Sequence, residues 1–492
     1  MKKKVLSALL VAAMSASMLA GCGSSSKGDD NVVNIYRCTY NLGNVDQDQV
    51  QKVEDAINAA LKAKGSNVQI NINDIVSGEY GNKASLAMAS GECDLLWNAS
   101  WWDSGIGTND LYANGSAYDL TSIIKGSKLE SSMDAGVWEA SKYDGKIYFV
   151  PVYKESYEGY DLKTPAAVVD KYGWDLSKIK GNSTIETLKN LEPMLADLKA
   201  DGYKYPYASV TTAMFYRYYI DEFDFFTQNA LFAVDRDTNS VINPIQTAEY
   251  KEFVTLMSEW AEKGYISQDE VTKATDSNVA QSSDWGFTWW TCVPGDEANT
   301  ESRDNQDEYV IDGITGKYMH STTTLGSCFT VNSACSEAKA KAAVEFLGYL
   351  YTDQEIANLY TFGIEGEDYT MVDGRVNQTS DKYNHAAWES TSVKILSLTT
   401  TEDADKVDQY VQMNGSAATS CAAGFRFDKS SVEAQYTACI SIMDEYGYNL
   451  ENGGFASADV DKTIAEYQSK LDAAGYQDVL AEFQKQYDAW KK

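Results

Sequence analysis

Several residue types that carry chemistry in enzymes and metalloproteins are scarce in this 492-residue chain. It has two histidines, His320 and His385, and none of its eight cysteines stands in the CxxC spacing of zinc and redox sites. We find no Walker loop, HExxH, GxSxG or dinucleotide-binding fingerprint. The sequence therefore gives no support to nucleotide-binding, metalloprotease or esterase functions, and we expect no metal and no cofactor.

Positive charge is also scarce. The 41 Lys and Arg residues stand against 72 Asp and Glu residues and leave a net charge of −31. Such a surface repels the phosphates of nucleic acids and the headgroups of anionic lipids. We therefore expect no nucleic acid partner, and no strongly anionic ligand unless a local basic pocket reverses the field.

Long apolar runs are confined to the start of the chain. Residues 5–19 are apolar, follow three lysines and end at Ala20-Gly21-Cys22. Two small residues before a cysteine are typical of a lipoprotein signal, and the run is short of the ~20 residues of a bilayer span. We expect a signal peptide at 1–21, a lipid on Cys22, a flexible tether at 22–31, and a mature protein on the extracellular face of a bacterial cell membrane. An ordinary secretory signal with an incidental Cys22 is the alternative.

Aromatic side chains, by contrast, are abundant, with 33 Tyr and 11 Trp residues. A sugar ring has an apolar face that an aromatic ring covers and a rim of hydroxyls that polar side chains hydrogen-bond. Many aromatics with few histidines favour a site for a polyhydroxylated ligand over metal or general-base chemistry.

Alternating strand and helix patterns indicate an α/β protein, and the chain is too long for one hydrophobic core. A β-branched run at 32–36, a helical pattern at 50–61 and an alternating segment at 68–72 predict a βαβ unit and a parallel sheet. A buried strand at 93–97 then leads into Trp101-Trp102-Asp103. Ligands bind beyond the carboxyl ends of strands in such sheets, so these residues are placed at a site.

The candidate ligand contacts follow from these predicted strands. For each tryptophan, core packing is an equal alternative; for each carboxylate, a solvated surface charge is the simpler explanation; and Tyr40 could be a lid over the edge of the first lobe. Alternation along a strand also requires that at least one of two adjacent tryptophans points away from the site. The candidates are Trp101 and Trp102 in the first lobe, Trp285, Trp289 and Trp290 in the second, and Tyr40, Asn41, Asp103, Glu155 and Asp284 as polar partners.

With these segments in place, the chain resembles the family 1 extracellular solute-binding proteins. The residues that carry the resemblance are the lipobox at Cys22, GKIYFVP at 145–151 and the run TLGSCFTVNSACSEAKAKAAVEFLGYLYTDQE at 324–355. The final quarter is similar to a lipoprotein subgroup with a C-terminal region of unassigned role, through FGIEGEDY at 362–369, GFRFD at 424–428 and the stretch from 473 to 490.

The resemblance implies a two-lobe, periplasmic-binding-protein-like α/β fold of type II, with a hinge and a ligand cleft between the lobes. Lobe one would comprise 32–150 plus about 305–360, and lobe two 151–304 plus about 361–492. It also implies a monomeric, non-enzymatic lipoprotein of an ABC transporter. Such a protein captures a carbohydrate, here an oligosaccharide, by hinge closure and delivers it to membrane permease subunits.

Two other functions stay open at this point. The same scaffold could bind a peptide or a polyamine. An extracellular glycoside hydrolase would need two carboxylates about 5 to 9.5 Å apart, which so acidic a chain could supply.

Overall fold

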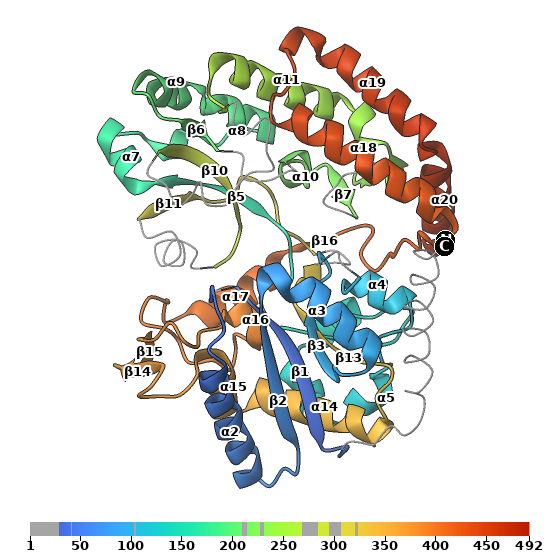
Figure 1. Ribbon diagram of the computed structural model, residues 1–492. Helices are drawn as coiled ribbons and strands as arrows, with labels where there is room; N and C mark the ends of the chain where they lie inside the picture. The colour runs from blue at the N-terminus through green and yellow to red at the C-terminus, as the bar shows by residue number, and fades with distance from the viewer. Residues whose placement is uncertain are drawn as a thin grey trace, which may run out of the picture.

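The computed structural model describes residues 29–40, 42–102, 105–208, 214–226, 231–267, 284–294, 307–319 and 323–491. The predicted signal peptide, Cys22 and two candidate contacts, Asn41 and Asp103, lie outside these ranges. The chain forms two α/β lobes, one above the other in Figure 1. Each lobe has its own sheet and its own hydrophobic core, as predicted for a two-lobe α/β fold.

Lobe one is built on a five-stranded sheet. Its order is β2 (Gln69–Val76), β1 (Val32–Thr39), β3 (Leu95–Asn98), β13 (Cys328–Val331) and β4 (Phe149–Pro151). The predicted βαβ unit is confirmed, because β1 and β2 pair in parallel and are joined by helix α2. The side chain of Asp46 caps α2 at Gln49 N, as the sequence indicates.

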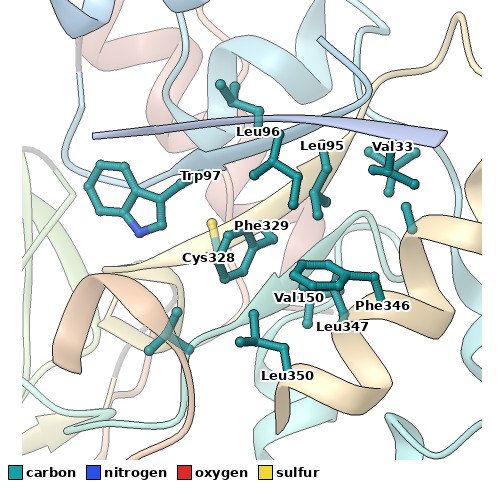
Figure 2. Close-up of a cluster of buried hydrophobic side chains, with 14 of the residues drawn as sticks. Val33, Leu95, Leu96, Trp97, Val150, Cys328, Phe329, Phe346, Leu347 and Leu350 are labelled. Carbon is teal, nitrogen blue, oxygen red and sulfur yellow. The ribbon is translucent and has the colours of Figure 1, made fainter. Parts of the chain in front are cut away.

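Helices cover both faces of this sheet (Figure 1). Figure 2 shows Val33 of β1, Leu95 of β3, Val150 of β4 and Phe346 of α14 in one buried cluster, with Trp97 at the end opposite Val33. The helices of lobe one are α2 (Gln47–Ala63), α3 (Ser77–Ser90), α4 (Thr108–Ala113), α5 (Thr121–Ile124), α6 (Ala135–Ala140), α14 (Glu337–Thr352), α15 (Gln354–Phe362), α16 (Ala387–Ser390) and α17 (Lys406–Ser416).

Lobe two has a four-stranded sheet with the order β11 (Glu308–Ile311), β5 (Tyr160–Pro165), β10 (Trp285–Thr291) and β6 (Tyr205–Tyr207). A second core forms on it that is separate from the core of lobe one. This lobe also has a smaller sheet of β7 (Phe223–Phe225), β8 (Ala233–Asp235) and β9 (Ser240–Ile242). Its helices are α7 (Ala166–Tyr172), α8 (Thr184–Asn190), α9 (Glu192–Ala200), α10 (Met214–Tyr218), α11 (Ala248–Lys263), α18 (Glu433–Glu451), α19 (Val460–Ala473) and α20 (Tyr476–Trp490).

The division between the lobes differs from the predicted boundaries at about 305 and 360. Strand β11 pairs with β5, so residues 308–311 belong to lobe two. Conversely, Tyr383 and Tyr410 are buried in the core of lobe one, and the hairpin β14 (Tyr369–Val372) and β15 (Arg375–Gln378) lies with that lobe in Figure 1. The difference arises because long-range strand pairing and packing decide these boundaries, and neither leaves a local pattern in the sequence.

Within the described residues, the chain passes between the lobes at about 152–159, at 312–319 with 323–325, and at 411–420. The passages are hydrogen-bonded to one another. Ser156 N donates to Asn414 Oδ1 at 2.8 Å, and Thr323 Oγ1 donates to Ser156 O at 2.8 Å. Strand β12 (Tyr318–Met319) also pairs with β16 (Ala418–Thr419). These contacts join the passages to one another in the hinge region.

A further contact joins the lobes beyond the hinge. The guanidinium carbon of Arg426 lies 4.3 Å from the centroid of the Tyr143 ring in lobe one. Lys429 Nζ lies 3.5 Å from Asp110 Oδ1 of α4. A cation over an aromatic face contributes about 0.5 to 2 kcal/mol, depending on its desolvation. The segment 421–429 therefore ties lobe two to lobe one.

No helix within the described ranges has both the length and the apolarity needed to span a bilayer.

We predict a coupling free energy of about 1 kcal/mol between Arg426 and Tyr143. A double-mutant cycle of Arg426→Met and Tyr143→Leu, followed by urea unfolding, measures it. Tyr143→Phe keeps the ring and should keep the coupling. Lys485→Met removes a charge that pairs with Glu482 within α20, so it should be additive with Tyr143→Leu. Additivity of the Arg426 and Tyr143 variants would contradict the prediction.

Candidate functional site

The carboxyl ends of β1, β3 and β4 lie at the edge of lobe one nearest lobe two. Strands β1 and β3 are parallel, and β13 is antiparallel to both β3 and β4, so β1, β3 and β4 run in one direction. Strand β4 continues directly into the first passage to lobe two. Residues that follow β1 and β3, including Tyr40, Trp101 and Trp102, therefore lie at the edge that faces the other lobe.

These residues form a cluster that we call the lobe-one aromatic group: Tyr40, Trp97, Trp101, Trp102 and Trp388. The rings of Trp101 and Trp102 have centroids 5.2 Å apart at 31°, and the ring of Tyr40 lies 6.2 Å from that of Trp102. Trp97 is fully buried beneath them, whereas Tyr40 and Trp101 are 39% and 42% exposed. Two partly exposed rings on a buried aromatic base form a surface suited to stacking.

The ring of Trp101 is held in place by the hinge side of the lobe. Its indole Nε1–H donates to Gly326 O at 2.7 Å, and Ser100 N donates to Leu325 O at 2.9 Å. Trp97 Nε1–H donates to Ser327 Oγ at 2.9 Å. The segment before β13 therefore fixes both indoles, which lowers the entropy lost when a ligand stacks on the exposed one.

In lobe two, strand register brings Trp289 and Trp290 to the edge nearest lobe one. Strand β5 begins just after the first passage, and antiparallel β10 places Thr291 opposite Tyr160 and Trp289 opposite Leu162. Val293, two residues beyond β10, packs against the core of lobe one. The carboxyl end of β10 thus lies beside the passage.

The two indoles occupy opposite faces of β10. Trp289 packs toward the lobe-two core, with its centroid 5.8 Å from that of Tyr160. The Trp290 ring lies 4.1 Å from Lys163 Nζ on the other face. This arrangement agrees with the expectation that two adjacent tryptophans of a strand lie on opposite faces of the sheet.

A cation and a tyrosine–carboxylate cluster lie on the core side of Trp289. The guanidinium carbon of Arg217 lies 4.2 Å from its centroid. The hydroxyls of Tyr160 and Tyr216 both donate to the carboxylate of Glu158, which stands at the end of the first passage. Residues 158, 160 and 216 are largely buried, so this cluster supports Trp289 from behind.

Two predicted contacts lie away from this edge. Trp285 is fully buried with Ala208 and pairs with Tyr205, at the end of β10 remote from the passage. Asp284 is exposed at that same end and accepts a hydrogen bond from Lys204 N at 2.9 Å. The structure places these two residues at the end of β10 remote from the passage, because β10 runs toward the passage and only its carboxyl end lies beside it.

Glu155 lies within the first passage and forms an ion pair with Lys154, each side chain being little exposed. It stands beside the hydrogen bonds that link the passages, since Lys154 O accepts from Asn414 Nδ2 at 2.9 Å. Asn41 and Asp103 lie outside the described residues, so their side chains are not placed.

Trp388 was missed by sequence analysis. Its centroid lies 5.2 Å from that of Tyr40 and 5.8 Å from that of Trp97. It belongs to α16, which is four residues long and follows β3 by almost three hundred positions. No local pattern points to this contact; the signal in the sequence is the second histidine, His385, three residues before it.

A buried ionic network anchors the α16 segment to the sheet. Arg37 of β1 and Asp74 of β2 form an ion pair, and His385 Nε2 lies 3.0 Å from Asp74 Oδ2. Glu389 Oε1 accepts from Ala386 N at 3.0 Å and lies 3.5 Å from His385 Nδ1. All four ionisable residues are at most 5% exposed.

The network stabilises its own charges. Burial acts to raise the pKa of Asp74, but the Arg37 guanidinium and His385 outweigh it and hold that pKa well below its usual value. Burial and Arg37 act to lower the pKa of His385, but Asp74 and Glu389 outweigh them, so its pKa is raised. The network therefore favours a charged histidine that bridges two carboxylates.

No group of three or more His, Cys, Asp and Glu side chains suited to a metal ion occurs among the described residues.

Comparison with known proteins adds two kinds of similarity. Residues 421–492 match a domain of unknown function, DUF3502. A curated protein of Streptococcus pneumoniae serotype 4, described as a carbohydrate ABC transporter substrate-binding protein, is 28% identical over 515 residues, which cover 100% of this chain and 99% of the relative. The similarity therefore spans the whole chain, both lobes included.

Solved structures agree with this. The N-glycan transport solute-binding protein NgtS of S. pneumoniae superposes with a TM-score of 0.76 at 25% identity, covering 93% of this chain and 98% of that one. The same protein in complex with Man5GlcNAc gives 0.71 at 25% identity, again over 93% and 98%. The alginate-binding protein AlgQ2, with a TM-score of 0.60 at 15% identity over 94% of this chain and 99% of that one, shares the fold.

We predict that Asp74→Asn destabilises the protein by about 3 to 5 kcal/mol, because it leaves the buried Arg37 charge without its partner. Chemical unfolding measures the change. Glu367→Gln removes an exposed pair with Lys52 and should cost less than about 1 kcal/mol. A cost for Asp74→Asn as small as that of the control would contradict the role given to the network.

Proposed function

We propose, on the premise that the chain belongs to the extracellular solute-binding proteins of ABC transporters, that it captures an oligosaccharide between its lobes and delivers it unchanged to a membrane permease. Membership rests on similarity along the full chain and on the shared fold. The observation that carries the ligand class is the pair of aromatic surfaces on the facing lobe edges. Trp101 and Tyr40 expose their rings in lobe one. Trp289 and Trp290 are partly buried on opposite faces of β10 at the lobe-two edge nearest lobe one, and we propose Trp289 as the ligand contact.

An oligosaccharide suits these surfaces physically. Aromatic rings cover the C–H faces of pyranoses, while carboxylates and amides satisfy the hydroxyl rim. Each buried hydroxyl left without a partner would cost about 1 to 3 kcal/mol. Glu155 in the passage, with Asn41 and Asp103, stays our proposal for polar partners. The relatives named above for N-glycan transport make mannose and N-acetylglucosamine oligosaccharides the first ligands to test.

Closure around the ligand follows from the fold. A ligand that touches both lobes binds best when the lobes are together, so it shifts the population toward that state by its difference in affinity for the two. A permease then recognises the closed form. The chain has no need to alter the ligand, and we propose a monomeric binding protein, not an enzyme.

The acidic surface narrows the ligand class. The net charge of −31 disfavours polyanions. Neutral glycans are therefore favoured over uronic acid polymers, even though an alginate-binding protein shares the fold.

We predict that the protein binds neutral oligosaccharides, and that Trp101→Ala or Trp289→Ala weakens binding at least about tenfold by removing a stacking surface. Calorimetry with Man1GlcNAc, Man5GlcNAc, alginate oligosaccharides, a peptide and a polyamine measures this. Trp138→Phe changes a buried lobe-one tryptophan outside the aromatic group and should leave affinity unchanged.

Chromatography of the recovered ligand separates a binder from an enzyme. Intact ligand supports the proposal, whereas cleaved glycan would replace it with a glycoside hydrolase. Tight binding of the peptide or polyamine alone would reassign the ligand class.

We also propose that Cys22 carries the lipid that holds the protein on the outer face of the cell membrane. Cys22→Ala should abolish incorporation of a fatty-acid label and release the protein from the membrane fraction, because no acyl chain remains to insert. Cys421→Ala, which removes an exposed cysteine of the folded body, should leave both unchanged. Labelled, membrane-bound Cys22→Ala protein would contradict the assignment.

A further inference from the structure

The C-terminal region, which matches a domain of unknown function, contacts helix α10, whose side chains pack around Trp289. Glu451 is the last residue of α18 and is 6% exposed. Its Oε2 accepts a hydrogen bond from Phe215 N at 3.0 Å. Phe215 is the second residue of α10, on the lobe-two side of the proposed ligand site.

The position of this carboxylate has a structural cause. The first N–H groups of a helix have no partner within the helix, and a buried donor left unpaired is costly. Glu451 supplies an acceptor at the start of α10 from a helix more than two hundred residues away. Gly453, two residues further, has φ +75 and packs so closely on α11 that an added Cβ would meet Met257 O at 2.4 Å. The end of α18 is therefore fixed against the lobe.

Helix α10 carries the groups that support Trp289. Arg217 places its guanidinium 4.2 Å from the centroid of the Trp289 ring, and Tyr216 donates to Glu158 at the end of the first passage. Both follow Phe215 directly in the chain. A shift of the first turn of α10 would move both groups and with them the ring that they hold.

We propose that Glu451 is a positioning residue for Trp289, acting through α10 and Arg217, and that this gives the C-terminal region a role in ligand binding. The inference rests on the proposed function for its ligand, but the contact with α10 does not depend on which ligand is bound. Trp289 is the group that contacts the ligand, and Glu451 affects its position indirectly, through α10 and Arg217.

The contact is sensitive to pH. Burial raises the pKa of Glu451 to about 7, an effect that the amides of Phe215 and Met214 and the charge of Arg217 only partly oppose. The other ionisable groups that face it are Tyr250 of α11 and Tyr467 of α19. Because the folded pKa lies above the ordinary value of 4.5, the stability contributed by Glu451 is present below pH 4.5 and is lost as pH rises through 7.

The first test follows the Trp289 ring itself. In protein labelled with 5-fluorotryptophan, the ¹⁹F resonance that disappears in Trp289→Phe belongs to Trp289. We expect it to shift with a midpoint near pH 7 in the wild type and to stay constant in Glu451→Gln, which keeps an acceptor but cannot ionise.

A second carboxyl group nearby needs a control. Burial and Asp221 raise the pKa of Glu222, just after α10, to about 7 as well. Glu222→Gln should leave the Trp289 titration intact. A titration that disappears in Glu222→Gln and persists in Glu451→Gln would overturn the proposal, and so would a Trp289 resonance that does not move in the wild type.

The second test measures affinity for a neutral glycan. Glu451→Leu removes the acceptor and should weaken binding about tenfold, whereas Glu451→Gln should bind within about twofold of the wild type. In a Trp289→Ala background, Glu451→Leu should have less than about a twofold effect, because the ring that it positions is gone. Equal losses in both backgrounds would overturn the proposal.

The matched control for these variants is Glu466→Leu. Glu466 of α19 accepts from Tyr446 OH at 2.8 Å, so its hydrogen-bond partner lies within the C-terminal region itself; its loss should leave affinity unchanged. If the wild type binds no glycan, the proposed function is refuted but the positioning role of Glu451 is not. The pH titration of the Trp289 resonance then still tests that role. If Glu451→Leu fails to fold, the comparison of wild type with Glu451→Gln carries the test.

Discussion

The register of strands on either side of the interlobe passages is the constraint on which the rest of the structure depends. Pairing of β13 with β3 and β4 brings Gly326 under the indole of Trp101. Pairing of β10 with β5 brings Trp289 beside the first passage. A slip of one residue in either pair would turn every side chain to the opposite face. The two registers therefore decide which aromatic side chains lie at the lobe edges where the chain crosses.

The fold followed from local signals to a large extent. The first βαβ unit, the cap at Asp46 and the strand that ends at Pro151 each have short-range causes, namely apolar periodicity, a side-chain acceptor and a missing amide. The same holds for the break between α19 and α20, where Gly475 has φ +92. These features needed no knowledge of distant contacts.

The site was less predictable, because its geometry is set by pairings between distant segments. Trp101 and Trp102 could be placed from the end of a parallel strand. The direction of β10 relative to the passage has no local signal in the sequence, and it puts Trp285 and Asp284 at the end of the strand remote from the passage. Trp388 joins Tyr40 from more than three hundred residues away, and the sequence between them has no pattern that reports the contact.

Both lobes use buried carboxyl groups in the same way. The four-residue helix α16 carries Trp388, and Glu389 accepts from the amide of Ala386 at its start. The five-residue helix α10 carries Arg217, and Glu451 accepts from the amide of Phe215. Helices this short have little stability of their own. In each case a buried carboxyl acceptor marks the start of the helix and so fixes where the side chains of that helix stand.

The hydrogen bond from Trp101 to Gly326 O also limits what that ring can recognise. An indole has a single N–H donor and no acceptor, and here the donor is already engaged by the backbone. In the proposed site, Trp101 would therefore discriminate among sugars only by the shape of the carbon skeleton that stacks on it. A pyranose whose axial hydroxyl projects toward the indole would be held farther from the ring and would stack less well. The configuration at one sugar carbon would then affect binding through this distance and not through a hydrogen bond.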